Sequence, residues 1–204
     1  MTGTTTADRR RALGAKGSRT RQRILDAAEK VFVDVGYHDA SIVRITEAAG
    51  VAQGTFYIYF GGKRELFEEL VADLNRRVRR AMSEAAAPGA ARLEAERAGF
   101  AAYFAFVAEH PGLYRIMRQA EFVSPGQLHR HYDRIVSGYT ERLRAAMDAG
   151  EIPPGEPELM AWALMGLGEM VGMRWVLWHD NKPVPDAVQA GTAAIIARIL
   201  GVAE

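Results

Sequence analysis

The hydrophobic positions of this chain recur with the spacing of helices. In residues 19–35 the apolar side chains fall at i, i+4, i+7, i+8 and i+11, which places them on one face of a helix. Gly36 then predicts the end of this helix. A shorter stripe follows, with Ser41 as its cap and Gly50 as its end. These two stripes consist of Ile24, Leu25, Ala28, Val31, Phe32 and Val35, and of Ile42, Ile45 and Ala49.

Glycine and proline divide the rest of the chain into further helical segments. Gly61-Gly62, Pro88-Gly89, His110-Pro111 and the two proline-rich loops at 152–157 and 181–185 are the clearest breaks. No segment shows the alternation of a strand, and no internal repeat is present. We therefore predict an all-α fold of nine helices, at 19–35, 42–49, 52–60, 63–87, 90–109, 111–122, 125–149, 156–179 and 184–201.

The predicted helix at 52–60 carries more apolar surface than one packed face needs. Phe56 and Phe60 are four residues apart and share one side, whereas Gly54, Tyr57 and Ile58 point to the opposite side. A glycine inside a helix costs ~1 kcal/mol relative to alanine, which favours a close approach to another backbone. A short helix, a glycine turn and a second helix with a polar start form the helix-turn-helix pattern, whose second helix enters the DNA major groove.

Charge is distributed unevenly along the chain. Residues 1–80 hold 15 basic and 10 acidic side chains, whereas residues 81–204 hold 11 basic and 15 acidic ones. A basic N-terminal part favours a polyanionic partner, although a solvated basic tail gives the same count. We expect residues 1–18 to form a disordered basic arm that reaches an adjacent minor groove or follows phosphates. The basic side chains of this region are Arg9, Arg10, Arg11, Lys16, Arg19, Arg21 and Arg23.

Composition excludes several other classes of protein. Without cysteine there is no disulfide framework, thiolate metal site or thiol nucleophile. No apolar run follows the first charges, so we expect no signal peptide. The long apolar stretch 159–178 contains Glu169 and Arg174, so we expect no membrane span. We therefore predict a cytoplasmic protein. His129 and His131 point to different sides of their helix, and no phosphate loop, nucleophile elbow or HExxH motif is present. We expect no catalytic residue, metal or cofactor.

Residues 20–70 resemble the TetR family of tetracycline-repressor-like transcriptional regulators. The resemblance lies in the sequence RILDAA, in Gly36-Tyr37, in Ala49-Gly50-Val51, in GTFYIYF at 54–60, and in Lys63 and Leu66. It implies a nine-helix fold with a helix-turn-helix DNA-binding domain at 19–65 and an effector-binding and dimerisation domain at 66–204. Ala52 and Thr46 depart from the family pattern: the alanine lacks a capping side chain, which is worth ~1 kcal/mol, and the threonine replaces a small residue.

The resemblance also implies roles for individual residues. Gln53, Gly54 and Thr55 would begin the recognition helix, with Gln53 able to pair with adenine and Ile58 able to contact a thymine methyl. Phosphate contacts are expected from Tyr57 and Lys63, and helix 42–49 would face the other backbone. The complete set of expected DNA-binding residues is Ser41, Arg44, Gln53, Gly54, Thr55, Tyr57, Ile58, Tyr59 and Lys63.

The C-terminal helices predict a dimer and an apolar pocket. We expect the last two helices to pair across a two-fold axis, with Gly168 and Gly172 allowing close approach and with Ile195, Ile196, Ile199 and Leu200 completing a four-helix bundle. The resemblance implies that a small molecule in the pocket releases a palindromic operator, usually from a repressor. A constitutive regulator without an effector is the alternative. The expected ligand-binding residues are Phe100, Tyr103, Phe104, Met117, Arg118, Glu121, Phe122, Met165 and Glu169.

Overall fold

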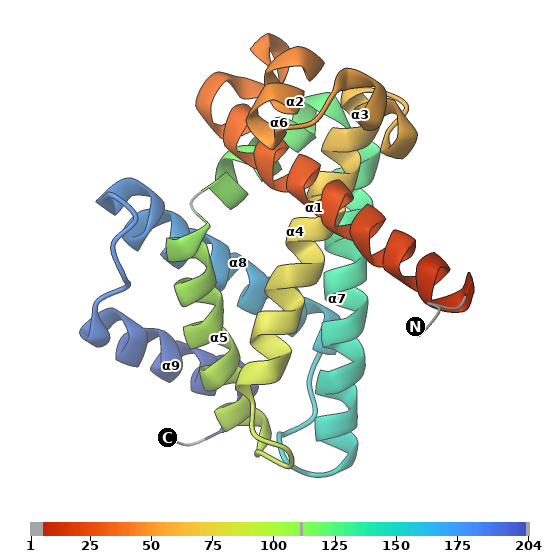
Figure 1. Cartoon of the computed structure of the whole chain (residues 1–204). Coiled ribbons are helices and arrows are strands. Elements are labelled where there is room, and N and C mark those ends of the chain that lie inside the picture. The colour runs from red at the N-terminus through yellow and green to blue at the C-terminus, as the bar shows by residue number, and fades with distance from the viewer. Residues whose placement is uncertain (1–5, 111, 203–204) are drawn as a thin grey trace.

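The computed structural model describes residues 6–110 and 112–202, and all regular structure in those residues is helical (Figure 1). The described residues form nine α-helices, as predicted, with one short 3₁₀ helix between the last two. Their bounds are α1 Thr6–Asp39, α2 Ile42–Ala49, α3 Gln53–Tyr59, α4 Lys63–Ala85, α5 Arg92–Glu109, α6 Gly112–Val123, α7 Pro125–Asp148, α8 Pro157–Trp175, η1 Leu177–His179 and α9 Asp186–Leu200.

The predicted helix ends are set by backbone conformation. Gly36 leaves helical geometry at φ 79° and ψ 167°, so only a short turn of α1 follows it. Gly50 ends α2 in the left-handed conformation, at φ 62°. The helix predicted at 156–179 is shorter than expected: α8 ends at Trp175, and after η1 the chain turns through Asp180 and Asn181, which both have positive φ.

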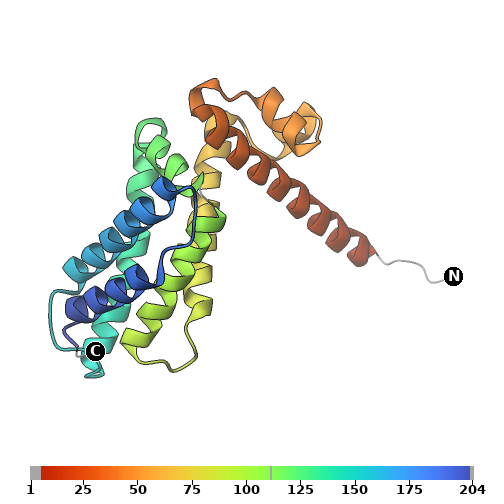
Figure 2. The same cartoon turned by 90° about the vertical axis from the view of Figure 1, so that its left-hand side faces the viewer.

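The prediction of a disordered arm at residues 1–18 is wrong for residues 6–18, which belong to α1. Alanine and arginine are strong helix formers, and each residue added to an existing helix gains a hydrogen bond. The hydroxyls of Ser18 and Thr20 bond back to the carbonyls of Gly14 and Lys16 along this helix. Figure 2 shows this part of α1 projecting away from the other helices. Residues 1–5, and the side chains of Arg9, Arg10 and Arg11, lie outside the described residues.

The first three helices and the start of α4 form a small domain around aromatic side chains. Phe32 lies in contact with Phe67 across a ring separation of 5.3 Å, and Phe56 lies 5.6 Å from Phe60. All four rings are fully buried or nearly so, and the side chain of Ile45 is buried with them. Burial of each such side chain contributes about 1.5–3 kcal/mol to folding, so the inner face of α3 holds the helix against the core.

The remaining helices form a larger domain, with α4, α5 and α7 along its length and α8 and α9 side by side on one face (Figure 2). Two helices of this domain hold α1. Gln119 of α6 accepts from the Tyr37 amide at 2.6 Å and donates to the Phe32 carbonyl. From α4, buried Asp73 accepts from Gln22 of α1 and pairs with Arg76 at 2.9 Å. In the described part of the chain no helix is long and apolar enough to span a membrane.

Candidate DNA interface and effector cavity

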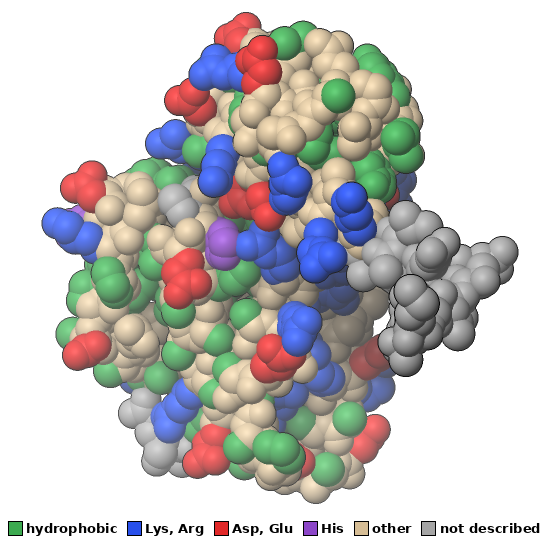
Figure 3. Space-filling model, viewed as in Figure 1, with side chains coloured by type: hydrophobic (Ala, Val, Ile, Leu, Met, Phe, Trp, Pro, Cys, Tyr) green, Lys and Arg blue, Asp and Glu red, His purple; other side chains and the backbone are tan. Residues whose placement is uncertain are grey.

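The outer face of α3 is exposed and packs against no other described helix. Tyr57 is 57% exposed and Ile58 is 76% exposed, whereas Phe56 and Phe60 on the opposite side are buried. Gly54 lies on the same outer side, and a Cβ added there would meet no atom within 4 Å. This division of the helix is the one that the sequence predicts. Green hydrophobic side chains are accordingly visible on the surface at the end of the molecule formed by α2 and α3 (Figure 3).

Helix α2 lies beside α3 and presents polar groups at its start. The hydroxyl of Ser41 accepts from the Arg44 amide at 3.1 Å, which is the capping bond that the sequence predicts. Arg44 extends to Asp34 of α1 at 2.7 Å, but both side chains are exposed. An exposed pair of this kind contributes little stability, so the Arg44 guanidinium is available to a stronger partner. As expected from its alanine, the start of α3 has no side-chain cap at Ala52.

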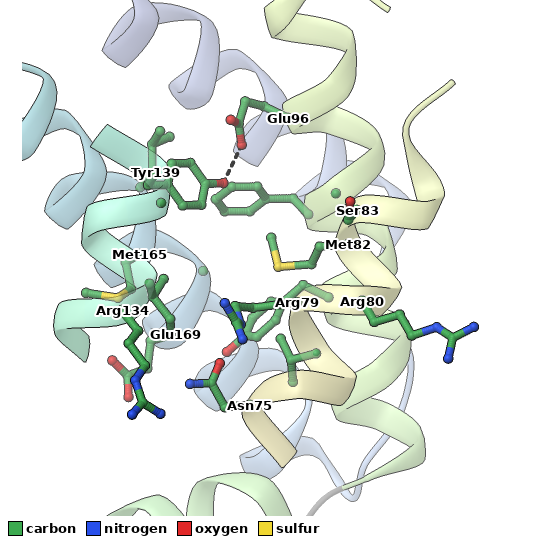
Figure 4. Close-up of a pocket in the computed structure, with 18 of the residues that line it drawn as sticks. Asn75, Arg79, Arg80, Met82, Ser83, Glu96, Arg134, Tyr139, Met165 and Glu169 are labelled. Carbon is green, nitrogen blue, oxygen red and sulfur yellow. Dashed lines mark hydrogen bonds between the residues drawn. The ribbon is translucent and has the colours of Figure 1, made fainter. Parts of the chain in front are cut away.

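A cavity of about 550 Å³ lies in the larger domain, enclosed by α4, α5, α6, α7 and α8 (Figure 4). Its middle is apolar. One end carries a hydrogen-bonded cluster in which Glu96 pairs with Arg92 and accepts from the hydroxyl of Tyr139. At the other end Tyr132 donates to Glu169 at 3.0 Å. The apolar lining includes Val78, Met82, Phe100, Leu113, Met117, Ile135, Leu164 and Met165.

Burial shapes the protonation of this cavity. Desolvation raises the pKa of Tyr139, and the neighbouring Glu96 raises it further. Burial likewise raises the pKa of Tyr103, whose hydroxyl lies 2.8 Å from that of Tyr114. For His131, burial and then the charges of two arginines lower the pKa to about 4. The hydroxyls are therefore hydrogen-bond donors at neutral pH, and the imidazole is uncharged. In the part of the chain that the structure describes, no group of acidic or histidine side chains is arranged to hold a metal ion.

Comparison with family models identifies both domains. Residues 24–70 match the model described as bacterial regulatory proteins of the tetR family, and residues 96–204 match the model described as the C-terminal domain of tetracyclin repressor-like proteins. The chain belongs to the TetR family. It is a DNA-binding transcriptional regulator with a helix-turn-helix domain, and the family is not an enzyme family.

Individual TetR-family relatives agree with this assignment. The chain is 42% identical to YdgC of Bacillus subtilis, an uncharacterized HTH-type transcriptional regulator, over 66 residues that cover 32% of this chain and 34% of YdgC. It is 26% identical to YhgD of the same organism over 76% of this chain and 84% of YhgD. A TetR-like regulator from Rhodococcus sp. RHA1 superposes with a TM-score of 0.66, at 30% identity, over 89% of this chain and 96% of that one. Other relatives are named as repressors and as an activator.

Two of the DNA-binding residues expected for this TetR-family protein are engaged within the chain. The ammonium of Lys63 donates to the carbonyls of Tyr37, His38 and Ala40 at 2.7, 3.1 and 2.7 Å, which uses all three of its protons. Tyr59 is half-buried against the core, with its hydroxyl turned toward Gly17 of α1. Both residues therefore have structural contacts within the chain, and their expected DNA contacts stay predictions.

Part of the basic N-terminal region is also used internally. Arg21 pairs with Glu69 of α4 at 2.6 Å and lies over the ring of Phe60. Arg23 donates to the carbonyl of Ala49 at 2.6 Å and so caps the end of α2. Lys16 and Arg19 remain exposed on α1. Figure 3 shows blue basic side chains gathered in a band below the helix-turn-helix domain.

Five of the nine expected ligand residues line the cavity, namely Phe100, Tyr103, Met117, Met165 and Glu169. The other four do not. Phe104 is buried in the core away from the cavity, and Arg118 extends outward to the sulfur of Met173 at 3.0 Å. Glu121 and Phe122 are exposed, Phe122 by 81%. The physical reason is helical phase: α6 turns Leu113 and Met117 inward, which leaves Arg118 and Phe122 on its outer stripe.

Sequence reasoning missed several polar side chains of the cavity. Asn75, Arg92, Glu96, His131 and Tyr139 all line it. Two of them carry a readable signal. Asn75 lies one turn after Val71, in the apolar stripe of α4, and Glu96 lies one turn before Phe100, in that of α5. A polar residue on a buried stripe requires a partner, and this pattern identifies both as members of an internal site.

Gly168 and Gly172 do not serve the helix pairing that the sequence suggested. A Cβ at Gly168 would contact Phe100 and Tyr103, and one at Gly172 would overlap with the Tyr114 hydroxyl. Both glycines therefore make room for rings of α5 and α6 within the same chain. Ile196 and Leu200 are likewise buried in the chain's own core, whereas Ile195 is exposed and Ile199 is half-buried.

A different face of α8 and α9 is apolar and exposed. On α8 the exposed apolar side chains are Leu159, Trp162 and Met170, and α9, which packs against α8, exposes Ile195. Gly166 and Gly191 interrupt this surface, and a Cβ at either would meet no atom within 4 Å. We refer to these six residues as the outer α8–α9 face. Exposed apolar side chains on two adjacent helices are a feature of protein interaction sites.

Proposed function

We propose that this protein is a ligand-responsive repressor that binds a palindromic operator as a homodimer and is released by an apolar or amphipathic small molecule. The observation that carries the DNA part is the outer face of α3. The side chains of Tyr57 and Ile58 are exposed, on a helix whose opposite side is buried in the core. A tyrosine hydroxyl suits a phosphate oxygen, and an isoleucine suits a thymine methyl.

Gly54, Gln53 and Thr55 complete the proposed reading surface. Nothing within the chain requires glycine at position 54, because the space beside it is open. A glycine there would let the DNA backbone approach the start of α3 closely, because glycine has no Cβ. We retain Ser41 and Arg44 as contacts from α2, because Arg44 is held only by an exposed ion pair.

The outer α8–α9 face supports the proposed dimer. One helix-turn-helix reads a few base pairs, and a two-fold pair reads two half-sites about one helical turn apart. A self-complementary apolar face on two adjacent helices can form a four-helix bundle with its copy. Trp162 provides a large aromatic contact, and Gly166 allows the helices to approach.

The cavity supports the proposed effector. Its volume of about 550 Å³ lies in the range of about 300–1,000 Å³ that is typical of small-molecule sites. Methionines 82, 117 and 165 give its wall an adaptable shape. A molecule held there releases DNA only by binding the released state better, and tenfold release needs ~1.4 kcal/mol of coupling.

Footprinting on the DNA upstream of the protein's own gene tests the operator. We expect two protected half-sites, a binding affinity that falls at least tenfold in Ile58→Ala, and little change in Phe122→Ala, a matched exposed apolar side chain. Equal binding by both variants would remove the α3 face from the interface. Sedimentation equilibrium of Trp162→Glu tests the dimer, since a charge on the outer α8–α9 face is expected to give monomers.

The alternative of a constitutive regulator is separated by a thermal-shift screen of apolar and amphipathic compounds. A ligand bound only by the folded protein raises its melting temperature by mass action. A compound that does so and also releases operator DNA supports the proposal. If stabilising compounds leave DNA binding unchanged, the constitutive alternative is correct.

A further inference from the structure

The cavity wall carries more positive than negative charge. Six arginines line it, at positions 76, 79, 80, 92, 134 and 142, against the two carboxylates Glu96 and Glu169. Three of the arginines already have a carboxylate partner. Arg76 pairs with Asp73 at 2.9 Å, Arg80 pairs with Glu84 at 2.7 Å, and Arg92 pairs with Glu96. A fourth, Arg142, lies over the ring of Tyr139.

Arg79 and Arg134 have no such partner among the described residues. Neither forms an ion pair or a hydrogen bond with the rest of the described chain; both line the cavity and are also exposed to solvent. Figure 4 shows Arg79 and Asn75 directed into the cavity from α4, and Arg134 on the opposite wall beside Glu169. Arg80, one residue further along α4, borders the cavity but turns its guanidinium away from it and pairs with Glu84, so it is not part of the proposed head site. The two guanidiniums therefore flank the end of the cavity opposite the Glu96–Tyr139 cluster.

Uncharged polar groups at the same end also lack partners. Asn75 is only 5% exposed, and its Oδ1 accepts no hydrogen bond. The Nδ1 of His131 is enclosed and equally without a partner. Arg79 and Arg134 both lie close enough to His131 to lower its pKa, after the larger effect of burial. Buried polar atoms are almost always hydrogen-bonded in folded proteins, so these two unpaired atoms, one on α4 and one on α7, mark this end of the cavity as a polar site. An anion only accepts hydrogen bonds, so it would bind the amide NH₂ of Asn75 and an Nδ1–H of His131, and not the Asn75 oxygen.

We propose that Asn75, Arg79, His131 and Arg134 bind the anionic head of an amphiphile, a carboxylate or a phosphate, whose apolar tail fills the middle of the cavity. This inference rests on the effector site proposed above and names its ligand class. The guanidiniums supply charge-assisted hydrogen bonds to the head. Glu169 is the carboxylate that lines this end, and Glu121 lies close enough to raise the pKa of Tyr132. Tyr132 donates to Glu169 at 3.0 Å, which directs that hydroxyl away from the head. Phe100, Met82 and Met165 lie along the path of the tail.

Head-group preference tests the inference directly. Four probes with the same twelve-carbon tail are titrated into the full-length protein below their critical micelle concentrations: dodecanoate, dodecyl phosphate, dodecanol and dodecyltrimethylammonium. We expect at least one anionic probe to bind about tenfold more tightly than dodecanol, the scale of one hydrogen bond to a charged group, and the cation to bind least. The tighter of the two anionic probes identifies the source of the head, a carboxylate or a phosphate.

Neighbouring arginines provide matched variants. Arg79→Gln is expected to reduce the preference for the anionic probe over dodecanol about tenfold while dodecanol binding stays the same, and Arg80→Gln is expected to change neither. Circular dichroism and melting temperature confirm that both variants are folded. The inference is overturned if the cation or the alcohol binds as well as the anions, if no probe binds, or if Arg79→Gln retains the full preference.

Release of operator DNA is measured separately with the same probes. Anion-selective binding without release upholds the anion site and rejects the proposed effector response. Release by an uncharged compound with no anion preference upholds the effector response and rejects the anion site.

Discussion

Replacing Gly172 by alanine is expected to destabilise the larger domain through one contact. A Cβ at this position would lie far inside the 3.0 Å limit for such atoms, against the hydroxyl oxygen of Tyr114. That ring is buried, and its hydroxyl bonds to Tyr103 at 2.8 Å. Overpacking costs about 1–3 kcal/mol, and a broken buried hydrogen bond costs about 1–3 kcal/mol more. Part of this loss is offset, because alanine is ~1 kcal/mol more favourable than glycine inside a helix.

The net expectation for Gly172→Ala is a loss of about 3 kcal/mol in the free energy of unfolding, or about 6–12 °C in melting temperature for a chain of this size. Urea denaturation at one fixed protein concentration measures it. Gly138→Ala is the control, because a Cβ there meets no atom within 4 Å. Adding Tyr114→Phe removes the overlapping oxygen, so the double variant should lose less than the sum of the two single variants. A Gly172→Ala protein as stable as Gly138→Ala would refute this reasoning.

Three further predictions concern single side chains. Lys63→Met is expected to reduce stability by about 2 kcal/mol, because three carbonyls lose a charged donor; an unchanged unfolding curve with weakened DNA binding would return Lys63 to the DNA interface. Gly54→Ala is expected to raise stability by about 0.5–1 kcal/mol and yet to weaken operator binding about tenfold, as measured by denaturation and gel shift; normal binding would contradict a close approach at this glycine. His131 has a pKa lowered to about 4 in the folded protein, so the unfolded chain binds its proton first as pH falls. Stability should be complete above about pH 6.5 and decline by about 3 kcal/mol toward pH 4. His131→Leu should flatten this decline whereas His129→Leu, at an exposed position, should not.

The helices were predictable because the signals for them are local. Gly36 and Gly50 end helices through their own backbone conformation, and Ser41 caps α2 with its own hydroxyl. The free face of α3 was equally predictable, since helical phase alone separates Phe56 from Tyr57. The extension of α1 to Thr6 was missed because a basic composition was given more weight than helix propensity.

The cavity was only partly predictable because its wall depends on how five helices cross. Helical phase places Phe100 and Phe104 on nearly the same stripe, but only the packing of α5 on its neighbours puts one on the wall and the other in the core. Likewise, the spacing of Gly168 and Gly172 predicts that something packs closely against α8, but it does not predict which element does so. Here the close neighbours are Tyr103 and Tyr114 of the same chain.

Helix α4 runs from the small N-terminal domain into the larger domain and so connects the two. Its first residue, Lys63, is fastened to the end of α1, and Glu69 and Asp73 hold α1 further along. Asn75 and Arg79, only a turn or two beyond Asp73, belong to the cavity wall. Sixteen residues separate Lys63 from Arg79, a span of about 24 Å at 1.5 Å per residue. A tilt of about 5° pivoting at the cavity would therefore move the start of α4, and the helix-turn-helix domain attached to it, through about 2 Å. The proposed effector would in this way change the spacing of the two helix-turn-helix domains in the proposed dimer.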